Sequence, residues 1–153
     1  MIPNALFSFT QTQSLTVALG ILTGLVWSRR TGWSCGGIIT PGILALCISD
    51  PARILFSLLL GTALTFPLAL AARTFRLYGR ERVGAAMLLA LAAKIGLAFL
   101  LPPGLRQTGW VVPGLIAADG ERQGLGMTLC GVIACTLVTV FGMTLLKRIL
   151  PGL

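Results

Sequence analysis

The stretch Gly37-Ile38-Ile39-Thr40-Pro41-Gly42-Ile43-Leu44-Ala45-Leu46 recurs, without a gap, as Gly109-Trp110-Val111-Val112-Pro113-Gly114-Leu115-Ile116-Ala117-Ala118. Each copy places Pro-Gly in the middle of an apolar run, where proline removes a backbone donor and glycine permits backbone angles that other residues avoid. We therefore expect a continuous helix to be interrupted at both pairs. In hydrocarbon, such an interruption must be covered by protein or face a wet cavity. Matching interruptions in two halves of a membrane protein point to a working site.

The composition is that of an integral membrane protein. Of the 153 residues, 56% are hydrophobic and only 10% are charged, and apolar runs near the ~20 residues that span a bilayer recur along the chain. The polar connections between the runs are too short to bury a soluble core. We expect one all-α membrane domain over residues 1–153, with a first repeat over residues 12–72 and a second over residues 83–146.

Four apolar runs predict full transmembrane helices, at about residues 12–27, 54–72, 83–101 and 125–146. The first is expected to be an anchor and not a removed signal peptide, because no cleavage site follows it. Asp50 before Pro51 is a helix-start signal, and residues 119–124 are expected to form a polar turn. Helices are expected to approach closely at five glycines, namely Gly20, Gly24, Gly61, Gly131 and Gly142.

The two Pro-Gly segments leave the number of crossings open. If both are re-entrant, the chain has four spans, with the basic connection over residues 73–82, Lys147 and Arg148 all on the inner side. If only the first crosses, Arg29 and Arg30 join that side, which the positive-inside rule prefers. As helices, residues 33–49 would reach about 25 Å and residues 109–118 about 15 Å of a ~30 Å core. Similarity between the segments favours the same mode of entry for both. The sequence therefore predicts four spans and leaves a fifth open.

The charge balance favours an anionic partner. Twelve Lys/Arg against four Asp/Glu give a net charge of +8, and the same charges also serve to orient the spans and to contact lipid headgroups. The connection over residues 73–82 is the densest cluster, and we place it in the cytoplasm. Nucleic acid is not an expected partner, because the basic residues are scattered over helix ends.

Residue types that carry most enzyme chemistry are scarce. The chain has no histidine, and its four cysteines form no C-x-x-C pair, so neither a metal site nor a Ser–His or Cys–His pair is predicted. We expect the cysteines to be small buried apolar residues. Since no phosphate-binding loop or paired-carboxylate motif is present either, the sequence predicts no catalytic residue, no metal and no cofactor.

Lys94 lies near the middle of the third predicted span, where a lysine costs about 2.5–3.5 kcal/mol on insertion scales. One interpretation is a structural ion pair with Asp50, Asp119 or Glu121, or snorkelling; the other is a role toward an anionic substrate or a partner subunit. Helices that start at the Pro-Gly pairs would add partial positive charge at their N-termini. The candidates for an anionic substrate path are Lys94, Arg122, Arg106, Pro41, Gly42, Pro113, Gly114, Asp50 and Asp119.

Five short motifs occur in an order and at a spacing that resemble a known family. They are Pro41-Gly42-Ile43-Leu44-Ala45-Leu46 with Asp50, Leu77-Tyr78-Gly79-Arg80, Lys94-Ile95-Gly96, Val112-Pro113-Gly114-Leu115-Ile116-Ala117 and Arg122-Gln123-Gly124. Over roughly residues 14–146 the chain resembles the CapC/PgsC family, the small membrane subunit of bacterial poly-γ-glutamate synthase. It departs from that family at Thr40, at Trp33-Ser34-Cys35 and at Asp119-Gly120.

The resemblance implies a non-catalytic, multi-pass subunit in the bacterial cytoplasmic membrane. Its complex would polymerise glutamate through γ-amide bonds and export the chain as capsule or released polymer. The implied partners are a cytosolic ATP-dependent amide ligase, a membrane-anchored extracytoplasmic subunit, the lipid bilayer and the glutamate polymer. We expect the ligase contact at Arg73, Arg76, Tyr78, Arg80 and Arg82. The alternative is a stand-alone organic-anion transporter or channel with the Pro-Gly segments as its substrate site; the missing histidines disfavour a membrane-embedded transferase.

Overall fold

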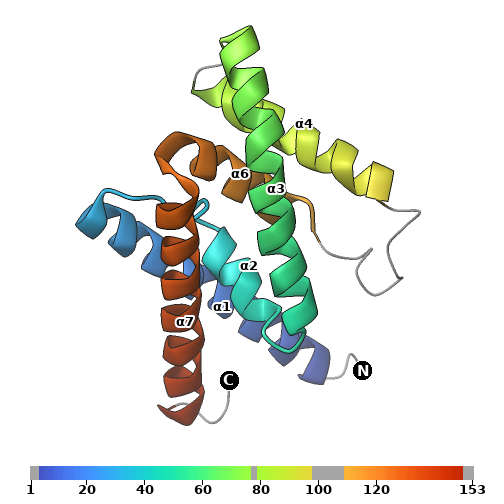
Figure 1. Cartoon of the computed structure of the whole chain (residues 1–153). Coiled ribbons are helices and arrows are strands. Elements are labelled where there is room, and N and C mark those ends of the chain that lie inside the picture. Colours follow the sequence, from blue (N-terminus) through green and yellow to red (C-terminus); the bar gives the residue numbers. More distant parts are fainter. Residues whose placement is uncertain (1–3, 77–78, 98–108, 150–153) are drawn as a thin grey trace.

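The computed structural model describes residues 4–76, 79–97 and 109–149, and every regular element in this part is a helix (Figure 1). The elements are α1 (Asn4–Thr31), α2 (Thr40–Leu46), α3 (Pro51–Phe75), α4 (Arg80–Leu97), α6 (Val111–Gln123) and α7 (Leu125–Ile149). Among the described residues, α3 and α7 are the helices long and apolar enough to cross a membrane. The predicted all-α class is confirmed, and two of the four predicted spans have the length and composition of transmembrane helices.

The Pro-Gly pairs begin helices and do not interrupt them. Pro41 and Gly42 lie in the first turn of α2, and Pro113 and Gly114 lie in the first turn of α6. In that turn a proline costs no helical hydrogen bond, because the first N–H groups of a helix have no partner within it.

A helix over residues 33–49 was considered only as the basis of a fifth span, and the seven residues of α2 are the helical part of that segment. The physical reason is the glycine-rich stretch before α2. Gly32, Gly36 and Gly37 hold positive φ angles of 74°, 71° and 91°, which right-handed helix geometry excludes. The chain therefore passes through residues 32–39 as a loop before the proline starts α2.

Two polar stretches that were expected to be connections are largely helical. Residues 119–123 are the end of α6, and the turn to α7 is made by Gly124 alone, at φ 96°. The predicted polar turn is therefore wrong for those residues. Similarly, α3 continues to Phe75 and α4 begins at Arg80, which shortens the basic connection to residues 76–79. Asp50 is the N-cap residue of α3, as predicted, although its carboxylate makes no capping hydrogen bond.

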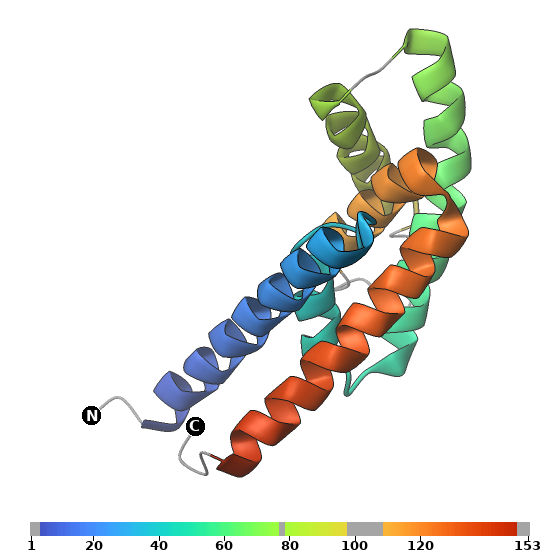
Figure 2. The same cartoon turned by 90° about the vertical axis from the view of Figure 1, so that its left-hand side faces the viewer.

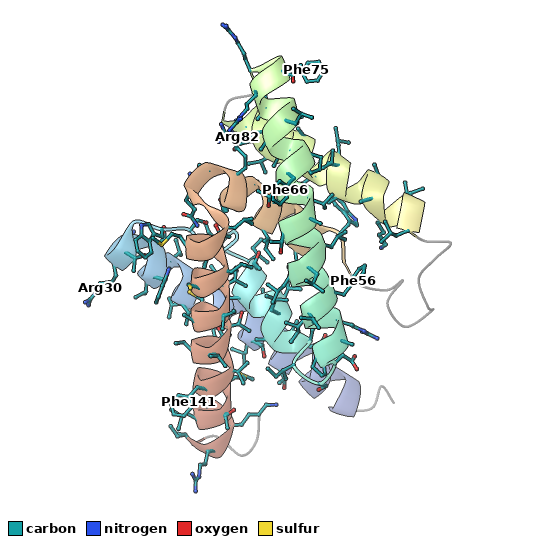
Figure 3. All side chains as sticks on the ribbon, in the orientation of Figure 1. Arg30, Phe56, Phe66, Phe75, Arg82 and Phe141 are labelled. Carbon is teal, nitrogen blue, oxygen red and sulfur yellow. The ribbon has the colours of Figure 1, made fainter. Side chains whose placement is uncertain are left out.

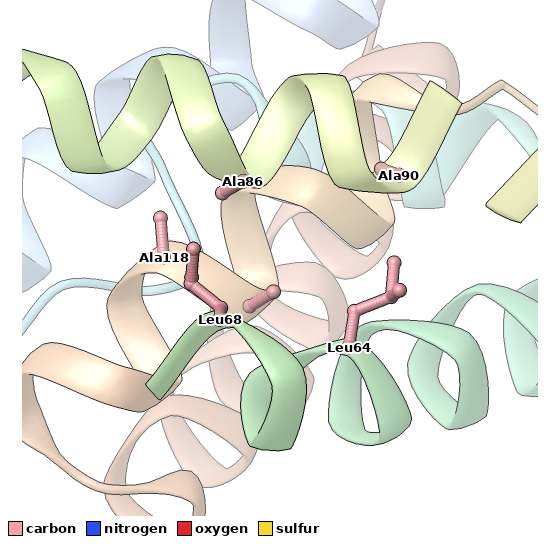
Figure 4. Close-up of a cluster of buried hydrophobic side chains, with 6 residues drawn as sticks. Leu64, Leu68, Ala86, Ala90 and Ala118 are labelled. Atoms are coloured by element: carbon pink, nitrogen blue, oxygen red, sulfur yellow. The ribbon is translucent and has the colours of Figure 1, made fainter. Parts of the chain in front are cut away.

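The main core lies where α6 packs against both α3 and α4. Leucines of α3 meet alanines of α4 and α6 in one buried cluster, made of Leu64, Leu68, Ala86, Ala90, Ala117 and Ala118 (Figure 4). Small residues set the helix spacing, because a Cβ added to Gly114 would lie 3.3 Å from the Cα of Met87. Close packing of this kind stabilises helix contacts where water is absent.

The short helix α2 is enclosed in a similar way by α1 and α7. A Cβ on Gly20 of α1 would lie 2.3 Å from the Cα of Gly42, so the two backbones touch. The predicted close approach of helices is confirmed at Gly20 and Gly61, whereas Gly24 and Gly131 lie tightly against the loop of residues 32–39. At Gly142 no close approach is seen, because an added Cβ there would meet no atom of the described residues within 4 Å.

One end of the molecule collects most of the arginines. We call it the arginine end and define it by Arg29, Arg30, Arg73, Arg76, Arg80, Arg82 and Arg122, which lie at the ends of α1, α3, α4 and α6. The start of α1 and the end of α7 lie away from it, toward the other end (Figures 1 and 2). Helix α7 starts beside the end of α6 and runs for 25 residues, about 37 Å.

Lys147 and Arg148 consequently lie opposite the basic connection of residues 76–79. The sequence places both groups on the inner side of a membrane, whereas the described helices place them at opposite ends of the molecule (Figure 1). The physical reason is that residues 32–46 lead from the arginine end to the start of α3 at the other end, and α6 leads back. As a result, α3 runs toward the arginine end and α7 runs away from it.

Candidate functional site

The arginine end is the candidate site, because it gathers charges that are far apart in the sequence. Four of its arginines belong to the connection recognised from the sequence, whereas Arg29, Arg30 and Arg122 join them only through the fold. Glu81, Asp119 and Glu121 lie at the same end, so basic residues outnumber acidic ones there. Tyr78 and Arg106, two of the predicted site residues, lie outside the described residues.

An ion pair ties α4 to α6 at this end. Arg82 Nη1 lies 2.9 Å from Glu121 Oε2, and the two side chains are 22% and 17% exposed. Figure 3 shows Arg82 close to where α6 passes α3. Because both partners are mostly shielded from water, each depends on the other for its charge balance. From the sequence, Glu121 was considered only as a possible ion-pair partner of Lys94.

Beside this pair runs an open groove of about 500 Å³, which we call the α3 groove. It is lined by Thr65, Phe66, Ala69, Leu70, Arg73, Gly120, Glu121 and Leu125. Glu121 is already paired with Arg82, and Arg73 has no carboxylate within 4 Å in the described chain. The groove therefore combines an apolar wall with one uncompensated positive charge.

A polar latch joins the loop before α2 to the end of α6; it consists of Ser34, Gly37, Asp119 and Gln123. Asp119 Oδ2 accepts a hydrogen bond from the Gly37 N–H at 2.8 Å and another from the Ser34 hydroxyl. Gln123 accepts from the Ser34 N–H at 2.8 Å and donates to the Ser34 carbonyl. These contacts satisfy the backbone of a loop that has no helical partners.

The latch brings together two of the polar departures that the sequence had marked separately, at Ser34 and at Asp119. Each looked like an isolated difference from the resembled family. Their contact between the loop before α2 and the end of α6 gives both a common physical reason, since the hydroxyl and the carboxylate satisfy each other. The signal in the sequence that could have predicted this contact was the presence of two polar departures from the resembled family, at Ser34 and at Asp119.

The sequence matches one protein family over most of its length. The family model described as Capsule biosynthesis CapC matches residues 19–129. The chain is also 33% identical over 122 residues to the PGA biosynthesis protein CapC of Bacillus subtilis (strain 168), covering 74% of this chain and 81% of that protein.

This chain belongs to the CapC family. The Capsule biosynthesis protein CapC of Bacillus anthracis is a further relative, 31% identical over 123 residues, with 75% of this chain and 82% of that protein covered. No solved structure matches the chain. The CapC match includes both Pro-Gly pairs, Lys94, the polar latch and the Arg82–Glu121 pair, and it confirms the resemblance inferred from the motifs.

In this CapC-family chain the Pro-Gly pairs are packing elements. Pro41, Gly42, Pro113 and Gly114 are all buried, and none of them lines the α3 groove. Gly42 lies against α1, and Gly114 lies against α4, at distances that leave no room for a side chain. The expected substrate-path residues are thus not assembled around one cavity in the described part of the chain.

The remaining predicted path residues are separated in space. Asp50 lies at the end opposite the arginine end and pairs with Arg53 at 3.4 Å, whereas Asp119 and Arg122 lie at the arginine end. Lys94 is half-buried in the last turn of α4. It forms no ion pair with the carboxylates of the described residues. The three proposed carboxylate partners of Lys94 are engaged elsewhere, so its interpretation as a structural ion pair is not supported.

Proposed function

We propose that this chain is the membrane subunit of a poly-γ-glutamate synthase complex. It docks an ATP-dependent amide ligase and assists polymerisation and export of the polyanionic chain. Family membership supports the pathway, since the relatives are named for PGA and capsule biosynthesis. The observation that carries the docking role is the arginine end, where helix ends from α1, α3, α4 and α6 present arginines on one side of a helical protein.

The arginine end faces the cytosol in this proposal. The positive-inside rule favours that orientation, because the opposite end holds only Arg53, Lys147 and Arg148 among the described basic residues outside α4. ATP is available to a ligase on that side. A growing polyanion and an acidic ligase surface would both be attracted to the same arginines.

We also propose that residues 12–72 and 83–146 form two repeats of opposite orientation. Each half contains a helix, a helix that begins at Pro-Gly and a final 25-residue helix, α3 or α7. The packing supports the repeat: α2 contacts α1 of its own half and α7 of the other, while α6 contacts α4 of its own half and α3 of the other. With three passages in each half, the chain would cross six times and its termini would share one side.

Charge reversal tests the docking role. Arg76→Glu with Arg80→Glu is expected to abolish co-purification of the ligase from detergent and to lower polymer output. Lys147→Glu with Arg148→Glu, the matched control at the opposite end, is expected to leave both unchanged. Equal co-purification of both double variants would remove the arginine end from docking.

The alternative function, a stand-alone organic-anion transporter, has its own test. It requires anion flux into liposomes that contain this chain alone, whereas the proposed subunit is inactive without the ligase. Lys94, half-buried and without a carboxylate partner among the described residues, is the candidate for contact with the polymer in the first function and with the transported anion in the second.

A further inference from the structure

Helices α1 and α7 lie side by side and run in opposite directions (Figure 2). Residues of both helices line a second groove, which we call the α1 groove. Its volume is about 410 Å³, and it is lined by Leu22, Thr23, Val26, Trp27, Arg30, Thr31, Cys135 and Val138. Apolar side chains form its length, and Arg30 closes it at the arginine end, where Figure 3 shows this side chain extending from α1.

Apart from Arg30, the side-chain hydroxyls of the α1 groove are already hydrogen-bonded within the protein. Thr23 shares a hydrogen bond of 2.8 Å with Thr139, and Thr31 donates to the Trp27 carbonyl at 2.8 Å. The indole N–H of Trp27 is buried toward α7, where a Cβ on Gly131 would lie 3.3 Å from it. The guanidinium of Arg30 has no carboxylate partner in the described part of the chain. The groove thus offers an apolar surface with a single cation at one end.

The lining favours a lipid chain over a helix from another protein. Helices that pack in membranes approach through small residues, and the small residues of α1, Gly20 and Gly24, already contact Gly42 and Cys35. The groove instead presents Leu22, Val26 and Val138, which are 59%, 51% and 54% exposed. Exposed, branched aliphatic side chains of this kind suit an acyl chain.

We propose that the α1 groove binds an anionic phospholipid, with one acyl chain along Leu22, Val26 and Val138 and the headgroup phosphate at Arg30. Tryptophan and arginine near a helix end are the residues that sit at headgroup level, and a basic side chain there attracts anionic lipid. The inference requires only that the chain lies in a bilayer. It does not depend on the ligase, so its failure would leave the proposed docking role intact.

Trp27 provides the measurement. With Trp33→Phe and Trp110→Phe, it becomes the sole tryptophan, and the protein is reconstituted in phosphatidylcholine vesicles containing brominated phosphatidylglycerol or brominated phosphatidylcholine. We expect brominated phosphatidylglycerol to quench Trp27 with an apparent preference of about fivefold, the effect of one arginine near an anionic headgroup. Arg30→Gln should remove the preference. Arg29→Gln, a matched change on the adjacent exposed arginine outside the groove, should retain it.

Two further results decide the occupant. Val138→Phe should fill the groove and reduce quenching by phosphatidylglycerol even though Arg30 is intact, which keeps the test valid if Arg30→Gln fails to fold. Equal quenching by both lipids in the parent, or a preference retained in Arg30→Gln, would overturn the proposal. Relief of quenching by soluble polyglutamate would also overturn it, because Arg30 would then bind the polymer and not a lipid.

Discussion

Arg82, in the first turn of α4, and Glu121, in the last turn of α6, form an ion pair with 2.9 Å between Nη1 and Oε2. The pair fixes the end of α6 against α4 and holds Glu121 at the rim of the α3 groove, where Arg73 stays uncompensated. A second ion pair, Asp50 with Arg53, is 55% and 34% exposed and joins residues of a single turn. The two pairs therefore differ in burial and in what they connect.

Breaking the shielded pair should destabilise the protein more than breaking the exposed one. Glu121→Gln leaves a mostly buried guanidinium without its carboxylate, and we expect a loss of about 1–3 kcal/mol, below the 3–5 kcal/mol of a fully buried pair. Asp50→Asn should cost roughly 0–1 kcal/mol. Thermal unfolding in detergent measures both, and the exchanged variant Arg82→Glu with Glu121→Arg should recover part of the loss. Equal melting temperatures for the two single variants would contradict the role of the pair.

The contact between Gly20 and Gly42 predicts a strong effect of adding a single methyl group. Gly20→Ala would place its Cβ 2.3 Å from the Cα of Gly42, and since backbone atoms cannot yield as side chains do, α1 and α2 must separate. We expect a large fall in melting temperature. Gly142→Ala is the matched control, because it lies in a helix with open space around it and gains about 1 kcal/mol of helix propensity. Similar melting temperatures for the two variants would contradict the close contact between α1 and α2.

The sequence predicted those parts of the fold that depend on local contacts and missed those that depend on distant ones. The predicted spans at residues 54–72 and 125–146 agree with α3 and α7 to within a few residues at each end, because an uninterrupted apolar run specifies its own helix. The helical conformation of residues 119–123 was not predicted. Asp119 and Gln123 form hydrogen bonds with Ser34 and Gly37, which are 82 to 89 residues away in the sequence. The Pro-Gly pairs were ambiguous because proline suits the first turn of a helix as well as a break. At the first pair, the positive φ angles of Gly36 and Gly37 decided between the two.

The polar latch predicts a difference between two adjacent residues. Gln123→Ala removes both hydrogen bonds to the Ser34 backbone, and unpartnered buried backbone groups cost about 1–3 kcal/mol each. Arg122→Ala, one residue away and exposed, should leave stability within about 0.5 kcal/mol of the parent. Detergent melting temperatures are the measurement. If loss of Gln123 has no effect, the loop of residues 32–39 does not lie on the end of α6.

The proposed six passages predict which sites an impermeant thiol reagent can reach on intact cells. In a variant without the four native cysteines, Asp50→Cys and Arg148→Cys should be labelled from outside, whereas Arg76→Cys should be labelled only after permeabilisation. Arg148→Cys is the informative position, since the four-span and five-span arrangements both place it in the cytosol. Protection of Arg148→Cys together with Arg76→Cys would contradict the inverted repeat.

Lys94 connects the structure most directly to polymer export. It is half-buried near the end of α4 and forms no ion pair among the described residues. The sequence predicts Lys94 at membrane depth, where a lysine carries an insertion penalty of about 2.5–3.5 kcal/mol, and its removal strands no carboxylate among the described residues. We therefore expect Lys94→Met to leave the melting temperature in detergent equal to or above that of the parent while lowering polymer yield or length. Lys94→Arg should be partly active because it keeps the charge that a passing polyglutamate would meet. Unfolding of Lys94→Met would restore a structural role for the lysine, and a stable variant with normal polymer output would exclude Lys94 from export.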